Sequence, residues 1–251
     1  MRWIRKPPEP PAAIAEYLAA QAPVGHGLDY PTFSGTGVPG APGSGSRGGQ
    51  LCRALIAQQH GLCAYTGAPI DHRIGKLKDP EEKLTFRAHN EHLKAQSQCR
   101  AELEAAGGAY GVNLGDDMAH GNIVAALLVS GAGNEKVDEH GLFGAAKRAN
   151  DPLPFYPTDP VCETKFLFDE NGGIHARQQN DVAARQVIGL LKLDHYTLET
   201  WRREAIAGFV DDLPEIELRI LSERIRNPGG QPLPEFSFVL LQIIEARLPS
   251  P

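Results

Sequence analysis

The sequence is poor in cysteine, in long apolar runs and in signals for export. Its 251 residues include four cysteines, and because no two of them form a Cys-x-x-Cys pair, their spacing indicates neither a disulfide framework nor a zinc site. No apolar run approaches the length of a membrane span, and the N-terminal stretch MRWIRKPPEPP lacks the apolar core of a secretory signal. These absences predict a cytoplasmic protein that does not enter a membrane.

Positive charge is also in short supply. Lysine and arginine number 25 against 31 aspartate and glutamate residues, which gives a formal net charge of −6 at pH 7. A chain of this charge is not expected to coat nucleic acid by itself, although the charge is compatible with a local basic groove or with a partner that supplies the binding surface. The glycine-rich P-loop pattern GxxxxGK[ST] is missing as well, so nucleotide hydrolysis by that route is not expected.

Changes in composition along the chain predict three regions. Residues 1–49 combine a basic, proline-containing arm, a short helix at Ala12–Gln21 and a glycine-rich linker. Residues 50–165 contain mixed elements, and residues 166–251 contain a hairpin followed by helices. This layout predicts an α+β fold with a helical C-terminal third.

Hydrophobic periodicity places the elements within these regions. A strand is predicted at 84–88, and a hairpin is predicted at 165–174 around the turn Asn171-Gly172-Gly173. The apolar segment NIVAALLVSG, which begins at Asn122, fits a helix and a buried strand equally well. Further helices are predicted at 50–61, 94–106, 145–150, 181–191, 196–211, 215–226 and 235–248.

The dipeptide Glu91-His92 is the feature with most chemical content. A carboxylate beside a histidine is what a one-metal phosphodiester-cleaving site needs, because the carboxylate helps to hold a divalent cation and the imidazole takes a proton from water. A later asparagine, Asn122, can fix the tautomer and orientation of the imidazole. On local sequence alone, a solvated polar turn is the simpler interpretation of this dipeptide.

Several motifs occur in an order that resembles one family. These motifs are QQHGLCAYT at Gln58–Thr66, EHLKAQS at Glu91–Ser97, Asn122-Ile123-Val124, KRANDPL at Lys147–Leu153, FLFDENGGI at Phe166–Ile174 and the helix end at Leu190–Leu193. In this order they resemble the PtuB-like HNH endonuclease subunit of Septu and retron-associated antiphage systems. The resemblance covers most of the chain.

The resemblance implies a fold and a set of roles. It implies a small ββα-metal (HNH) core between about residues 50 and 165, surrounded by helices, in which one Mg²⁺ or Mn²⁺ ion is clamped against the scissile phosphate of nucleic acid. His92 would be the general base, Glu91 would bind the metal, and Asn122 would orient the active-site loop or the imidazole. Cationic side chains would contact phosphates, namely Lys147 at the catalytic centre, with Lys94 and Arg148 in substrate binding. An ABC-type ATPase subunit would be the partner.

The chain departs from the family at the zinc knuckle and at the last metal ligand. Of the four knuckle cysteines only Cys63 is present, since Thr66, Leu127 and Phe143 stand at the other positions, and a structural zinc is therefore not expected. The last metal ligand would fall near Gly144, which has no side chain to offer, so His140 is the candidate third ligand. His89 and His120 are alternatives to it.

Three hypotheses follow from these features. The first is an active metal-dependent endonuclease, which the Glu91-His92 pair and Asn122 favour. The second is a degenerate HNH module that binds nucleic acid or a partner without cutting, which the lost cysteines and Gly144 favour. The third is a scaffold subunit of a larger assembly.

Overall fold

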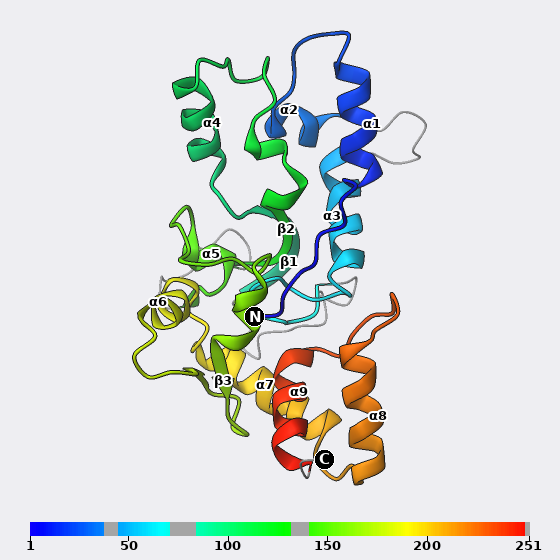
Figure 1. Ribbon diagram of the computed structural model, residues 1–251, viewed down its shortest axis with the longest axis vertical. Coiled ribbons are helices and arrows are strands. Elements are labelled where there is room, and N and C mark those ends of the chain that lie inside the picture. The colour runs from blue at the N-terminus through cyan, green and yellow to red at the C-terminus, as the bar shows by residue number, and fades with distance from the viewer. Residues whose placement is uncertain (38–44, 71–83, 132–140, 249–251) are drawn as a thin grey trace.

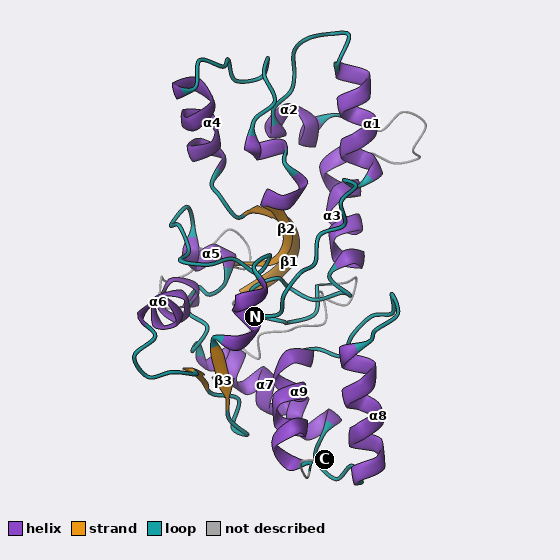
Figure 2. Cartoon of the chain, in the orientation of Figure 1, coloured by secondary structure: helices purple, strands orange, loops and turns teal. Residues whose placement is uncertain are grey.

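The computed structural model describes residues 1–37, 45–70, 84–131 and 141–248, and these form a mixed α+β structure (Figure 1). Figure 2 shows two short sheets lying among helices. The predicted α+β class is confirmed at this level. Within the described parts of the chain, no helix combines the length and the apolarity that crossing a membrane requires.

The helices and strands have the following bounds. The strands are β1 Leu84–His92, β2 Ile123–Gly131, β3 Phe166–Phe168 and β4 Ile174–Ala176. The helices are α1 Ala12–Gln21, α2 Tyr30–Gly35, α3 Arg47–Gln58, α4 Gln96–Ala105, α5 Ala145–Arg148, α6 Val182–Leu191, α7 Tyr196–Phe209, α8 Glu215–Arg226 and α9 Ser237–Arg247. Short 3-10 turns occur at Asp116–Met118, His120–Asn122 and Pro160–Thr164.

The central sheet is an antiparallel pair of β1 and β2, in which His92 lies opposite Ile123. The apolar segment NIVAALLVSG, whose sequence fits a helix and a strand equally well, forms the strand β2. Its first residues, 123–127, are all buried because α3 packs against the sheet and α5 packs against β2, and a strand covered on both faces reads as a continuous apolar run. The buried Gln59 amide donates to the Ala125 carbonyl over 2.7 Å and accepts from the Ala125 N–H, which satisfies the edge of β2 that faces away from β1.

Two predictions of local structure are wrong. The strand predicted at 84–88 continues to His92, so Glu91 and His92 lie within β1 and not in a polar turn. The glycine-rich region 22–49 contains a packed helix, α2, whose Phe33 is fully buried. Asp29 caps this helix by accepting from Thr32 N over 2.9 Å, a local signal that the surrounding glycines and prolines obscured.

The C-terminal region contains the predicted hairpin, β3–β4, followed by helices α6–α9. Gly172 is at φ +85° in the hairpin turn, and a Cβ there would lie 2.2 Å from the Glu199 carbonyl oxygen of α7, so the turn needs glycine. The buried Arg202 of α7 donates to the carbonyls of Gly172 and Leu193, which joins the hairpin to the α6–α7 connection. The buried apolar side chains of this region and of the β1–β2 sheet form one continuous core.

Candidate active site at the end of β1

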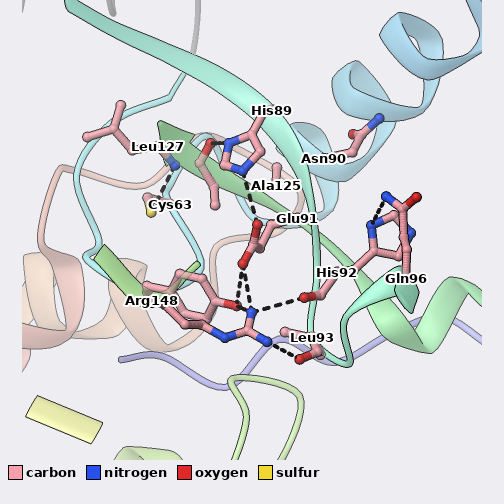
Figure 3. Close-up of polar contacts among 12 residues, drawn as sticks. Cys63, His89, Asn90, Glu91, His92, Leu93, Gln96, Ala125, Leu127 and Arg148 are labelled. Atoms are coloured by element: carbon pink, nitrogen blue, oxygen red, sulfur yellow. Dashed lines mark hydrogen bonds and ion pairs between the residues drawn. The ribbon is translucent and has the colours of Figure 1, made fainter. Parts of the chain in front are cut away.

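The side chains of Glu91 and His92 point to opposite faces of β1 (Figure 3), as expected for neighbours in a strand. Glu91 shares its face with His89, whose Nε2 lies 3.1 Å from Glu91 Oε2. His92 shares its face with Asn90, and both contact Tyr30 of α2. The extension of β1 therefore separates the two groups that the one-metal interpretation places together.

The carboxylate of Glu91 is held by three protein side chains. Arg148 Nη1 of α5 donates to Glu91 Oε1 over 2.7 Å, and the Tyr65 hydroxyl lies 3.3 Å from the same oxygen. His89 contacts the second carboxylate oxygen. The Glu91 side chain is 13% exposed and that of Arg148 is 1% exposed, so this is a nearly buried ion pair. We refer to Tyr65, His89, Glu91 and Arg148 as the Glu91 cluster.

Arg148 uses its donors within the protein. Its Nε donates to the Asp151 carbonyl, Nη1 donates to the Tyr65 hydroxyl, Glu91 and the His92 carbonyl, and Nη2 donates to the Leu93 carbonyl. The guanidinium thus ties α5 to the last residues of β1 (Figure 3). The side chain predicted to bind substrate instead contacts the protein interior in this structure.

His92 is 7% exposed, and both of its ring nitrogens have partners. Nε2 lies 2.9 Å from the Asp117 carbonyl oxygen and so carries the proton, while Nδ1 lies 3.2 Å from the Gln96 amide nitrogen and accepts from it. Burial lowers the pKa of His92 below its ordinary value, and the Asp117 carbonyl opposes this shift. The imidazole is therefore neutral at pH 7, as a general base must be, but it lies behind the protein surface.

Asn122 holds the loop that follows β1. Its Oδ1 accepts from Lys94 N over 2.7 Å, and its Nδ2 donates to the carbonyls of Lys94 and Asp116, each over 3.1 Å. Of the two roles that the resemblance implies for Asn122, these contacts correspond to orienting the loop, since the imidazole partners of His92 are Asp117 and Gln96.

Of the predicted phosphate-contacting lysines, Lys94 pairs with carboxylates other than Glu91. Lys94 Nζ lies 2.5 Å from both Asp116 Oδ2 and Glu102 Oε2, and hydrogen bonding to these two carboxylates raises its pKa. Lys147 is half-buried on α5.

His120 Nε2 lies 3.0 Å from Gln58 Oε1, and burial lowers the pKa of His120 to about 4. The candidate third ligand, His140, lies outside the described residues.

The described residues do not fit a Mg²⁺ or Mn²⁺ ion at Glu91. Among them, no group of three or more histidine, cysteine, aspartate or glutamate side chains is placed to hold a metal. The Arg148 guanidinium already lies 2.7 Å from the Glu91 carboxylate. A divalent cation bound to the same carboxylate would therefore be repelled by the buried positive charge of Arg148. In the Glu91 cluster, the Arg148 guanidinium is the cation that pairs with the Glu91 carboxylate.

The segment that corresponds to the zinc knuckle keeps a closed turn. Cys63 N donates to the Ala68 carbonyl over 2.8 Å, and Gly67 N donates to the Cys63 carbonyl over 3.0 Å. Cys63 Sγ accepts from Leu127 N over 3.2 Å, and a Cβ on Gly144 would lie 3.4 Å from Thr66 Cγ2. The four positions named from the resemblance therefore converge around the turn, where Leu127 and Phe143 are buried apolar side chains.

Sequence reasoning missed Tyr65 and the buried role of Arg148. Tyr65 lies within the CAYT phrase and is fully buried, and burial together with the charge of Glu91 raises its pKa well above the ordinary value. The AYT spacing gave no sign that this hydroxyl contacts both Glu91 and Arg148. Comparisons of the sequence with known protein families and with curated proteins find no match.

Proposed function

We propose that the chain is a degenerate HNH-type module of an antiphage defence complex, which binds nucleic acid beside an ABC-type ATPase partner and does not cut it. The observation that carries this proposal is the ion pair between Glu91 and the buried Arg148. A metal ion binds through carboxylate oxygens, and both oxygens of Glu91 already have protein partners that a metal ion would have to displace or share.

The order of elements supports the HNH-type assignment. β1 and β2 form an antiparallel pair whose connection contains α4 and two 3-10 turns, and the short helix α5, which comes after β2, packs against β2. The Glu-His dipeptide ends the first strand, and Asn122 immediately precedes the second and fixes the connecting loop. The order of these motifs along the strand pair supports the HNH-type assignment, while the ion pair of Glu91 and the burial of His92 support the degenerate form.

One observation favours the second candidate, an active metal-dependent endonuclease. Burial keeps His92 neutral, and the Asp117 carbonyl fixes the proton on Nε2, which leaves Nδ1 as the basic atom. Nδ1 would accept a proton from water only after the Gln96 hydrogen bond opens. Glu91 would in addition need release from Arg148.

A nuclease and binding assay separates the two candidates. Labelled single-stranded and duplex DNA and RNA would be incubated with the chain alone and with a co-expressed ABC-type ATPase, while Mg²⁺ and Mn²⁺ are titrated. We expect binding without metal-dependent cutting, and the same outcome for His92→Ala. The control is His175→Ala, which alters an exposed histidine paired with Asp169.

Cutting that depends on Mg²⁺ or Mn²⁺ and falls roughly 10²-fold or more in His92→Ala would establish the endonuclease instead. A chain that binds no nucleic acid, alone or with the ATPase, would leave the scaffold interpretation.

A further inference from the structure

A pocket of about 460 Å³ is lined by residues that do not belong to the Glu91 cluster. It is bounded by the N-terminal arm, the C-terminal end of α3, the turn at 62–67, the C-terminal end of α8 and the first turn of α9. The N-terminal arm begins at the N label in Figure 1. Among the residues that the structure describes, its charged lining consists of Arg2, Arg5 and Arg226 against one carboxylate, Glu163. We refer to this site as the basic pocket. Its positive charge contrasts with the net charge of −6 of the whole chain.

The arginines of the basic pocket have N–H groups that are not engaged in strong contacts with the residues that the structure describes and can donate to an anion. Arg5 is exposed and makes no hydrogen bond or ion pair with any residue that the structure describes. Arg2 donates one bond, from Nη2 to the Ile225 carbonyl over 3.1 Å, and burial lowers its pKa, so an anion beside it would favour its charged form. Arg226 pairs with Glu245, but with side chains 51% and 46% exposed this pair is weak and can exchange for a phosphate.

An aromatic ring accompanies these charges. Trp3 is 37% exposed, and its indole N–H donates to the Thr158 carbonyl over 3.3 Å, which fixes the ring at the pocket wall. A fixed, half-exposed indole beside arginines is the combination that binds a base by stacking and its phosphate by charge. The pocket volume is also within the usual range for a site that holds a small organic group.

We propose that the basic pocket binds one nucleotide unit of a single-stranded nucleic acid, with its phosphate at Arg5 and Arg226 and its base against Trp3. This inference rests on the proposed nucleic-acid-binding function and gives that function a location. The pocket shares no residue with the Glu91 cluster, so nucleic acid binding here does not require the cluster to change.

The test compares two arginines of α8. Arg226 and Arg219 are both about half exposed and each pairs with one exposed glutamate, but only Arg226 lines the pocket. Binding of a labelled eight-nucleotide single strand to the full chain would be followed by anisotropy at several salt concentrations. We expect Arg226→Gln and Arg5→Gln each to weaken affinity about tenfold and to lower the salt slope by about 0.7, with Arg219→Gln unchanged.

A gain of affinity provides a second, independent readout. Glu163→Gln removes the only carboxylate among the charged pocket residues while retaining the oxygen that accepts from Trp3 N. We expect it to strengthen binding about threefold. A merely destabilised protein would not gain affinity, and the melting temperature of each variant reports on folding.

The outcomes are distinct. Equal losses in Arg226→Gln and Arg219→Gln, or wild-type affinity in Arg5→Gln and Arg226→Gln, would overturn the pocket assignment while leaving the proposed function intact. Binding of a mononucleotide or of inorganic phosphate as tightly as the oligonucleotide would overturn the single-strand assignment in favour of a free ligand. If the wild type binds no nucleic acid at all, the proposed function fails and the pocket assignment fails with it.

Discussion

The Glu91 cluster and the basic pocket place the same type of side chain in opposite situations. Arg148 is buried, and protein acceptors occupy its Nε, Nη1 and Nη2 atoms. Arg5 is exposed and has no partner in the described part of the chain. A buried arginine with satisfied donors contributes to structure, because any ligand must first displace protein contacts, whereas an unpaired arginine in an open pocket is available to an anion.

The largest expected effect is on the buried side of this comparison. Arg148→Met leaves the nearly buried Glu91 carboxylate with only the Tyr65 and His89 contacts, and it removes the bonds to the carbonyls of His92 and Leu93. We expect a loss of roughly 3–5 kcal/mol in the free energy of unfolding, measured by urea titration. Arg219→Gln, on the surface of α8, should change it by less than about 0.5 kcal/mol. A loss below about 1 kcal/mol in Arg148→Met would mean that the pair is not a structural element.

A double-mutant cycle measures the pair itself. Glu91→Gln, Arg148→Met and the double variant should show a coupling energy of about 1–3 kcal/mol, because the two side chains share one hydrogen bond and the Tyr65 hydroxyl. Additive losses would assign the cost of Arg148→Met to its carbonyl contacts alone.

The loop after β1 provides an intermediate effect. Asn122→Ala removes the two hydrogen bonds between the Asn122 side chain and the Lys94 backbone N–H and carbonyl. It also removes the bond to the Asp116 carbonyl. We expect a loss of roughly 1 kcal/mol in the free energy of unfolding, since two part-buried backbone groups of Lys94 lose their partner. The control Asn227→Ala removes one exposed bond to Glu223 and should be nearly neutral. Equal losses in the two variants would remove the structural role of Asn122.

The smallest effect concerns pH and His120, which contacts Gln58 at the edge of the basic pocket. Because its pKa is lowered from 6.5 to about 4 by burial, the unfolded chain binds the proton more readily than the folded one. Stability from this group is complete above pH 6.5 and is lost as the pH falls towards 4. His120→Gln should therefore flatten the dependence of unfolding free energy on pH in this window. An unchanged slope would contradict the prediction.

Local patterns predicted much of the fold and part of the candidate site. The hairpin turn at Asn171-Gly172-Gly173 and the helices after it were found from short-range signals, because turn geometry and helix periodicity act within a few residues. Helix α2 was missed, since its cap lies within a region dominated by glycine and proline. The end of β1 was missed because pairing with β2, and not the local sequence, extends the strand to His92.

The sequence by itself determined the α+β class, the positions of most elements and the presence of Glu91, His92 and Asn122 near the central strands. Hydrophobic periodicity and motif order can be read from residues that are close together in the sequence. Only the tertiary structure decided what these side chains do. Burial and pairing depend on residues distant in sequence: Arg148 meets Glu91 57 positions away and Tyr65 83 positions away. The same long-range packing pairs Glu91 with Arg148 inside the protein and leaves Arg5 exposed in the basic pocket.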